Sequence, residues 1–299
     1  MKRVLLLHNQ DAGDEDYFRS ELVQIIKNEG HDCTYFPIKE NNNWKKEIDN
    51  IDLIVVAGGD GTIRRIVKEL MKRKKRDQRI PLAILPMGTA NNLSRSLHYN
   101  PDLDIKSRIR NWKDTKKNMF DLGEIHNADS SDYFLEGTGY GIFPELIRQM
   151  DARDLSHLER AEDRLKLALQ ELHSIVLSAP AAPFQIEADG KLLEGKALLV
   201  EVMNIQSVGP NLNLAPSAKI DDGVFDLVIV HEEQRNAFAD HVAAQIGRQE
   251  DSWRYKSIQA KKLIIDCKSE YMHIDDELIT NSQQPSIFIV HDKELKFLI

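Results

Sequence analysis

The sequence predicts an α/β domain followed by a β-rich domain. Over the first half of the chain, short apolar runs alternate with helical patterns, which is typical of an α/β domain with a mainly parallel sheet. From about Leu122 onward, strand-like runs and turn residues predominate around one long amphipathic helix. A chain of 299 residues is long enough for two hydrophobic cores. We therefore expect residues 1–122 and 123–299 to form the two domains, with the last residues able to return to the first.

Four strands and two helices are expected in the first domain. Leu53–Ala57 is wholly apolar, as expected of a strand that is covered on both faces of a sheet. Leu22 and Ile26 stand at helical spacing, and Gly30 follows where that helix would end. The expected strands are Val4–Leu7, Thr34–Ile38, Leu53–Ala57 and Leu82–Leu85, and the expected helices are Asp16–Asn28 and Ile63–Lys74.

A mostly antiparallel sheet and one helix are expected in the second domain. Asp189-Gly190 is a favoured pair for a tight turn, so it would join Phe184–Ala188 and Ala197–Met203 into a hairpin. Leucines at helical spacing in Leu155–Leu177 predict an amphipathic helix that ends before Pro180. The other expected strands are Tyr133–Gly137, Phe225–Val230, Leu263–Cys267, Tyr271–Ile274 and Ser286–Val290.

The composition excludes several classes of protein. With 40 Lys and Arg against 48 Asp and Glu, the net charge is −8, which argues against a protein whose whole surface binds nucleic acid but leaves room for a local basic patch. Cys33 and Cys267 have no metal-ligand spacing, which excludes a recognisable zinc site and favours a reducing compartment. Val4–Leu7 is too short for a signal peptide, and no run approaches the roughly 20 apolar residues of a membrane span. We expect a cytoplasmic protein that meets a membrane only peripherally, at its inner face.

A glycine-rich turn follows the apolar strand Leu53–Ala57. Its residues, Gly58-Gly59-Asp60-Gly61-Thr62, precede a predicted helix, so backbone N–H groups and the positive end of the helix dipole would point to one place. Such a place suits phosphate, and glycine lets a ligand approach the backbone. Asp60 would repel phosphate unless its carboxylate binds a cation or takes a proton. The alternative is a structural turn in which Asp60 or Thr62 caps the helix.

The next strand ends in a second turn of the same kind. Leu82–Leu85 runs into Pro86-Met87-Gly88-Thr89-Ala90-Asn91-Asn92, which again offers glycine, hydroxyl and amide groups before a helix start. Neither turn has the GxxxxGK[ST] or GxGxxG pattern of the common nucleotide sites. Ligands of open α/β sheets bind beyond the carboxyl ends of the strands, so the two turns could converge on one ligand.

Two acidic segments lie in the second half. Asp275-Asp276-Glu277 follows the strand-like run Tyr271–Ile274, and one of its carboxylates could act as a base. Such clusters are otherwise typical of solvated turns. Pro216–Gly223 contains Asp221-Asp222-Gly223, which predicts either a β-turn or an oxygen-rich loop able to hold Mg²⁺.

Together, these four segments resemble the diacylglycerol kinase catalytic family, which includes sphingosine kinases and bacterial lipid kinases. The resemblance rests on GGDGT, PMGTANN, PSAKIDDG and IDDE, in this order over nearly the whole chain. It implies a Rossmann-like N-terminal α/β domain, similar to those of NAD kinase and phosphofructokinase, and a C-terminal β-sandwich. It also implies an ATP- and Mg²⁺-dependent kinase that phosphorylates diacylglycerol or a related lipid alcohol.

The resemblance assigns roles to the matching residues. Asp275 would be the general base that takes the proton from the lipid hydroxyl, with Glu277 in support. Asp60 would join the Mg²⁺ and phosphate network. Asp222, with Asp221 as the less certain neighbour, would hold a structural Mg²⁺. The residues that would bind ATP are Asn9, Gly58, Gly59, Asp60, Gly61, Thr62, Gly88, Thr89 and Asn91.

The chain also departs from the family pattern. The departures are Gln10, Arg64-Arg65, Asn92 and Asp276. We expect Arg64-Arg65 on an exposed helix face, because arginine is mostly a surface residue, and we expect Asp276 to restrict the backbone where the family has glycine. Asp121-Leu122-Gly123 resembles a short family segment at the domain junction. Because Asp60 and Asp275 are retained, an active kinase is expected.

Alternatives and partners follow from the same residues. An NAD kinase shares the GGDG turn, and a nucleotide-binding regulator without catalysis would explain the departures. A lipid substrate requires contact with a membrane surface, which Lys72–Arg76 and Arg108–Lys117 could assist. These cations could equally complement helix dipoles. An exposed sheet edge could support a homodimer.

Overall fold

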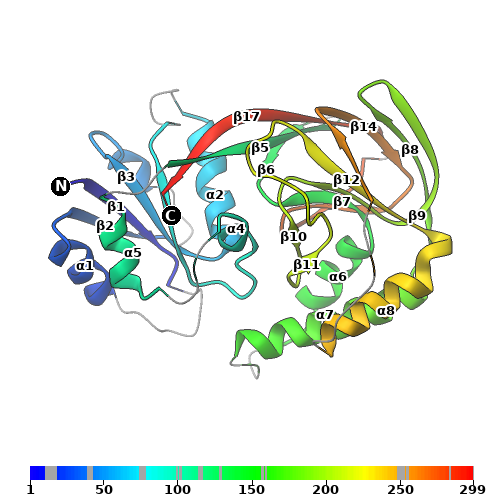
Figure 1. The fold of residues 1–299 in the computed structure, drawn as a ribbon, viewed down its shortest axis with the longest axis horizontal. Coiled ribbons are helices and arrows are strands. Elements are labelled where there is room, and N and C mark those ends of the chain that lie inside the picture. Colours follow the sequence, from blue (N-terminus) through cyan, green and yellow to red (C-terminus); the bar gives the residue numbers. More distant parts are fainter. Residues whose placement is uncertain are drawn as a thin grey trace. The chain divides into compact units, whose positions relative to one another are not determined.

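The chain forms two compact units in the computed structural model (Figure 1). Unit 1 comprises Met1–Phe120 and Lys293–Ile299, and unit 2 comprises Asp121–Asp292. The structure describes residues 1–10, 19–38, 43–73, 79–98, 100, 103–113, 117–127, 130–155, 158, 160–247, 253, 256–282 and 284–298.

Unit 1 contains a parallel sheet. Its strands are β1 (Arg3–His8), β2 (Asp32–Pro37), β3 (Leu53–Gly58), β4 (Leu82–Pro86) and the end of β17 (Ser286–Leu298), in the order β17-β4-β3-β1-β2. The pairs β1–β2, β1–β3, β3–β4 and β17–β4 are all parallel. All six residues of β3 are buried, which confirms that both faces of this strand are covered.

Short helices accompany the strands of unit 1. They are α1 (Arg19–Asn28), the 3₁₀ turn η1 (Asn43–Lys46), α2 (Asp60–Met71), α4 (Asn92–Ser96) and α5 (Ile105–Asn111). The expected helix Asp16–Asn28 is confirmed from Arg19 onward, and Asp16–Phe18 lie outside the described residues. The helix expected from Ile63 begins three residues earlier, at Asp60, because the chain turns into a helix directly after Gly59.

The expectation of an exposed Arg64 is wrong. The apolar stripe of α2 consists of Ile63, Ile66, Val67 and Leu70, and Arg64 is itself only 4% exposed. Arg64 precedes Val67 by three residues, so it lies at the edge of the buried stripe, where an arginine can bury its aliphatic stem. Arg65 is half-buried.

Unit 2 is built mainly from antiparallel strands. β5 (Lys117–Asn127) begins in unit 1 and continues into unit 2, where it pairs with β6 (Ser130–Phe134). The main order is β16-β15-β7-β9-β8-β14-β17, and β12 pairs with β9 and β13. These strands are β7 (Gly137–Gly141), β8 (Ala182–Ala188), β9 (Lys191–Met203), β12 (Phe225–His231), β13 (Ser257–Ala260), β14 (Lys262–Cys267), β15 (Tyr271–Ile274) and β16 (Glu277–Thr280). A separate small pair consists of β10 (Ser207–Val208) and β11 (Leu212–Asn213).

The hairpin expected at Asp189-Gly190 is confirmed. Ala188 pairs with Lys191, so the two residues between them form the turn. Both have positive φ, +46° at Asp189 and +85° at Gly190, as a tight turn between twisted antiparallel strands requires. The return strand starts at Lys191 rather than Ala197, because its ladder with β8 continues through residues that have no apolar pattern.

Within its described residues, unit 2 also contains three helices and a 3₁₀ turn, namely α6 (Ile142–Asp151), α7 (Ala161–Ser178), η2 (Glu232–Gln234) and α8 (Arg235–Ile246). Figure 1 shows α6, α7 and α8 gathered beside the strands of this unit. One apolar core lies between these helices and β9 and β12, and includes Phe143, Leu172, Val230 and Phe238. A second core joins residues of the strands, including Phe134, Tyr140, Phe225 and Phe288. No helix within the described ranges is long and apolar enough to cross a membrane.

Candidate functional site

The two glycine turns of unit 1 lie in direct contact. Gly58 pairs with Pro86 at the ends of β3 and β4, and the Met87 N–H donates to the Gly58 carbonyl at 3.0 Å. A Cβ atom on Gly88 would lie 2.5 Å from the Cα of Gly59, closer than any carbon contact allows. The two turns therefore lie in contact, as convergence on one ligand would require, and glycine is required at Gly88 by the close approach of the backbones.

Asp60 joins the two turns. Its carboxylate accepts hydrogen bonds from the backbone N–H groups of Asn92, at 2.8 Å, and Leu93, at 3.3 Å. These N–H groups begin α4, and the first N–H groups of a helix have no partner within it. Asp60 thus stabilises the start of α4 from a distance of 32 residues in the sequence, while it also stands in the first turn of α2.

Side-chain amides complete this edge of unit 1. Asn91 adopts the left-handed conformation, with φ 52°, and its amide accepts from the Gly88 N–H at 3.0 Å and donates to the Gly88 carbonyl at 2.7 Å. Asn9, just beyond the end of β1, donates to the Thr62 hydroxyl at 3.0 Å. Gly61 and Thr89 are half-buried in their turns. The structure therefore brings the expected residues of unit 1 together at the carboxyl ends of the parallel strands.

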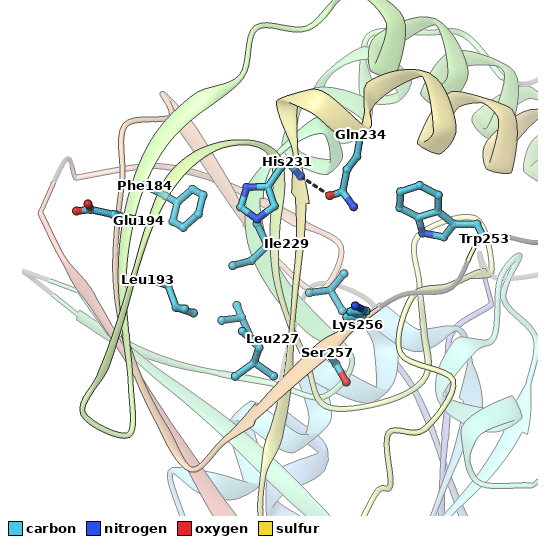
Figure 2. Close-up of a pocket in the computed structure, with 12 residues that line it drawn as sticks. Phe184, Leu193, Glu194, Leu227, Ile229, His231, Gln234, Trp253, Lys256 and Ser257 are labelled. Carbon is cyan, nitrogen blue, oxygen red and sulfur yellow. Dashed lines mark hydrogen bonds between the residues drawn. The ribbon is translucent and has the colours of Figure 1, made fainter.

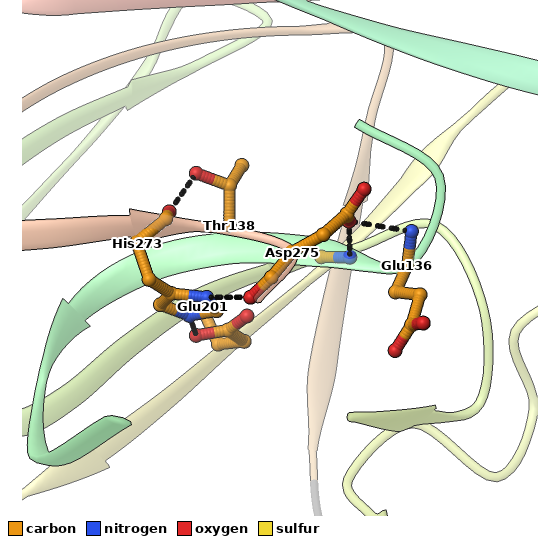
Figure 3. Close-up of polar contacts among 6 residues, drawn as sticks. Glu136, Thr138, Glu201, His273 and Asp275 are labelled. Carbon is orange, nitrogen blue, oxygen red and sulfur yellow. Dashed lines mark hydrogen bonds and ion pairs between the residues drawn. The ribbon is translucent and has the colours of Figure 1, made fainter. Parts of the chain in front are cut away.

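Asp275 is the anchored carboxylate of unit 2 (Figure 3). It is 7% exposed, and its Oδ1 accepts from the N–H groups of Glu136, at 2.8 Å, and Gly137, at 3.1 Å. The Leu135 N–H donates to Oδ2 at 2.9 Å. The carboxylate is thereby fixed at the turn between β6 and β7, and three donors of this kind complement its ionised form.

Asp275 lies in a tight turn. Ile274 pairs with Glu277, so Asp275 and Asp276 form a two-residue turn. Asp275 has φ +52°, whereas Asp276 is not among the residues with positive φ, so the aspartate at that position does not strain the backbone. Asp276 and Glu277, the first residue of β16, are both exposed.

A buried acid and histidine lie beside this turn, and the sequence interpretation missed their connection. Glu201 of β9 and His273 of β15 are 0% and 1% exposed. His273 Nε2 lies 2.9 Å from Glu201 Oε2, and His273 Nδ1 lies 2.8 Å from the carbonyl oxygen of Asp275 (Figure 3). Burial raises the pKa of Glu201. Burial alone would lower the pKa of His273, but the charge and hydrogen bond of Glu201 raise it overall.

The aspartates expected to hold metal lie on an exposed loop. Asp221 and Asp222 are both exposed, and the Asp222 carboxylate accepts from Val224 N–H at 3.4 Å. Asp121 is 0% exposed and accepts from the Gly223 N–H at 2.6 Å, so it fixes this loop. In the part of the chain that the structure describes, no three His, Cys, Asp or Glu side chains form a cluster able to hold a metal ion.

Asn204 connects the Asp121 segment to the turn that Asp275 holds. Its side-chain amide donates to the carbonyls of Asp121, at 2.9 Å, and Leu135, at 3.0 Å. Its backbone N–H donates to the Glu136 carbonyl at 2.9 Å. No sequence pattern identified Asn204, because its partners lie 69 and 83 residues away.

Several side chains of the expected basic stretches form hydrogen bonds or ion pairs within unit 1. Arg108 is buried and donates to the Asn100 carbonyl, and Arg110 forms an ion pair with Glu29 at 3.2 Å. Lys72 pairs with Glu69 at 3.0 Å. Residues 74–76 and 114–116 of these stretches lie outside the described residues.

A cavity of about 660 Å³ lies elsewhere in unit 2, over β8, β9, β12 and β13. Figure 2 shows Phe184, Leu193, Leu227 and Ile229 along its apolar part and Lys256 at its margin. The residues that line this cavity do not include Glu201, His273 or Asp275.

Comparisons with known proteins agree with this architecture. Residues 3–125 match the diacylglycerol kinase catalytic domain, and residues 150–290 match the YegS C-terminal NAD kinase beta sandwich-like domain. A diacylglycerol kinase of Bacillus subtilis (strain 168) is 29% identical over 238 residues, which cover 77% of this chain and 74% of that protein. A diacylglycerol kinase of Staphylococcus aureus (strain bovine RF122 / ET3-1) is 26% identical over 275 residues, 90% of this chain and 82% of that protein.

Solved structures share the fold. A crystal structure of a diacylglycerol kinase from Bacillus anthracis str. Sterne has a TM-score of 0.74 at 22% identity, over 99% of this chain and 96% of that one. An NAD kinase from Archaeoglobus fulgidus, solved in complex with ATP, has a TM-score of 0.54 at 13% identity, over 99% and 93% of the two chains. The predicted fold class, a Rossmann-like α/β domain with a β-sandwich domain, is confirmed.

Fold and matches together define a kinase composed of an α/β domain and a β-sandwich domain. Within that class, residues 3–125 match the diacylglycerol kinase catalytic domain, in agreement with the resemblance of the GGDGT and PMGTANN segments.

Proposed function

We propose that this protein transfers the γ-phosphoryl group of ATP to the hydroxyl group of a lipid, diacylglycerol or a related lipid alcohol. The observation that carries the proposal is the contact between the two glycine turns, at Gly59 and Gly88, beyond the ends of adjacent parallel strands. Ligands of parallel α/β sheets bind at this edge. The relatives named diacylglycerol kinases supply the class of acceptor.

The turns of unit 1 suit the phosphates of ATP. Gly59 precedes α2, a helix of 12 residues, so the positive end of its dipole faces the turn. Gly58–Thr62 and Gly88–Asn91 would bind the phosphates at this place. Asp60 fixes the relation between the two turns, so that the phosphate-binding backbone is preformed rather than assembled by the ligand.

Asp275 suits the role of general base in unit 2. A base must be held in position and kept ionised, and three backbone N–H groups serve both needs. In the proposed step, the carboxylate takes the proton of the lipid hydroxyl. The hydroxyl oxygen then forms a bond to the γ-phosphorus of ATP while the bond to the β-phosphate oxygen breaks, giving a lipid phosphate and ADP.

Magnesium would enter this reaction with ATP. In kinases Mg²⁺ is commonly bound by one or two carboxylates together with the substrate phosphates, so a closed protein cage is not required. The carboxylate that would assist this ion is Asp60 in unit 1, whereas Asp222, with Asp221 as its less certain neighbour, would hold a separate structural Mg²⁺ in unit 2. When bound, the ion would neutralise charge on the transferred phosphoryl group.

Transfer from labelled ATP to separate acceptors tests the proposal. The acceptors are diacylglycerol, monoacylglycerol, ceramide, sphingosine and phosphatidylglycerol in mixed micelles, and NAD in solution, each with Mg²⁺ and with EDTA in its place. We expect label in one lipid, and its loss in EDTA. Transfer to NAD alone would establish an NAD kinase, and ATP binding without any transfer would favour a regulator.

A further inference from the structure

Glu201, His273 and Asp275 form a chain of hydrogen bonds inside unit 2 (Figure 3). Glu201 and His273 are almost completely buried, and Glu201 Oε1 has no hydrogen-bond partner among the described residues. Burying a carboxyl group with an unsatisfied oxygen costs free energy, and a pair of apolar side chains would usually pack there at less cost. A buried pair of this kind calls for an explanation beyond stability.

The positions of the protons follow from the hydrogen-bond partners. A backbone carbonyl oxygen only accepts, so His273 Nδ1 must carry the hydrogen of its 2.8 Å bond to Asp275. The 2.9 Å contact between Nε2 and Glu201 then contains one proton, whichever group holds it. Glu201 therefore holds the histidine in the state in which Nδ1 donates to Asp275.

The surrounding strands leave space for this arrangement. A Cβ atom on Gly139 would lie 2.3 Å from Glu201 Oε2, and one on Gly137 would lie 2.8 Å from Oε1. Both glycines belong to β7, which pairs directly with β9 and β15. The Thr138 hydroxyl, between them, donates to the His273 carbonyl at 2.6 Å. The small residues of β7 thus accommodate the acid and the histidine together.

We infer that Glu201 and His273 are positioning residues for Asp275. The hydrogen bond from Nδ1 holds the peptide of Asp275, whose φ of +52° is uncommon for a residue with a side chain. This backbone direction sets where the carboxylate meets the N–H groups of the β6–β7 turn. The catalytic part of the inference rests on the proposed function, in which Asp275 is the general base.

Two substitutions of His273 distinguish the roles of its two ring nitrogen atoms. The amide nitrogen of asparagine lies as many bonds from the backbone as Nδ1, and that of glutamine as many as Nε2. Glu201→Gln serves as the background, because an amide there leaves no unpaired buried charge. E201Q/H273N therefore retains the donor to Asp275, whereas E201Q/H273Q does not.

Steady-state kinetics and amide hydrogen exchange provide the readouts. We expect E201Q/H273Q to have a kcat about 100-fold below that of E201Q/H273N, since a displacement of about 1 Å of a catalytic group costs this much. KM for ATP should agree between the two. The N–H groups of Leu135, Glu136 and Gly137 should exchange faster only in E201Q/H273Q. His241→Gln, at another buried histidine of unit 2, is the control that should keep the wild-type kcat.

The two hypotheses fail in different ways. If wild-type protein transfers phosphate to no acceptor, the proposed function fails, and hydrogen exchange alone decides the positioning role. Equal kcat and equal exchange in the Asn and Gln variants, with both folded by thermal melting, would overturn the inference. If both double variants unfold, the positioning role is decided by amide hydrogen exchange in the single variants E201Q and Glu201→Leu. Protection of 135–137 lost in E201L but kept in E201Q supports the inference, and equal protection in the two refutes it.

Discussion

Gly88→Ala should damage the proposed nucleotide site by forcing the two glycine turns apart. The new Cβ would lie 2.5 Å from Gly59 Cα, whereas carbon atoms in contact lie about 3.5–4.0 Å apart, so the two turns must separate by about 1 Å. Forced separation of packed groups costs about 1–3 kcal/mol of stability. A misplacement of this size within a site lowers turnover by about 100-fold.

Calorimetric titration with ATP and initial rates of phosphoryl transfer measure this effect. We expect weaker ATP binding together with the loss of turnover, because Gly88 lies in a turn proposed to contact the phosphates. Gly190→Ala is the matched control. At Gly190 φ is +85° and a Cβ would meet nothing within 4 Å, so the substitution costs about 1–2 kcal/mol of backbone strain but leaves the turns in contact.

A clear result would refute this reasoning. If G88A bound ATP and turned over like wild type, while its thermal melting showed a folded protein, the contact between the turns would not control nucleotide binding. Equal losses of ATP affinity in G88A and G190A would point instead to general destabilisation of the chain.

Three further predictions concern carboxylates and a buried histidine. Asp60→Asn loses a charged acceptor at the start of α4 and should lower the free energy of unfolding by about 1–3 kcal/mol, measured by denaturant titration. Asp121→Asn should lower the free energy of unfolding by a similar amount, because the buried carboxylate of Asp121 accepts a hydrogen bond from a backbone N–H. Asp222 is exposed, so Asp222→Asn should change the free energy of unfolding by less than about 0.5 kcal/mol. Equal effects of the two substitutions would contradict the argument from burial. Burial lowers the pKa of His241 to about 4 in the folded protein, whereas the same side chain in the unfolded chain has a pKa near 6.5. As the pH falls, the unfolded chain therefore takes up this proton before the folded protein does. Stability should be complete above about pH 6.5 and fall by up to about 3 kcal/mol towards pH 4, and His241→Gln should flatten this part of the melting-temperature profile.

Local patterns predicted many elements of the fold, but the expected strand Tyr133–Gly137 is wrong, because β6 ends at Phe134 and β7 begins at Gly137. Leu53–Ala57 was recognisable because both faces of the strand are buried, and Asp189-Gly190 because few residue pairs adopt positive φ twice. Helix α8 was missed, since its alanine-rich sequence has no distinct apolar stripe although Phe238 and Val242 are buried. The start of β9 was missed because exposed charged residues there pair through the backbone alone.

The site was predictable only where its residues are consecutive. The Gly59 and Gly88 turns follow adjacent strands, so their meeting could be inferred from the sheet. That Asp60 caps α4 depends on contacts 32 residues away, which no local pattern encodes. Glu201 did offer an indication, since it is a single carboxylate within the apolar run Leu198–Met203, and a buried charge requires a partner.

Asp275→Asn tests the central claim most directly. Phosphoryl transfer from labelled ATP with Mg²⁺ would be measured for wild type and D275N on the accepted lipid, with ATP binding and thermal melting measured in parallel. General-base catalysis contributes about 100- to 10,000-fold, so D275N should lose at least the lower of these factors in kcat while it still binds ATP. A folded D275N with wild-type turnover would contradict the assignment of Asp275 as the base.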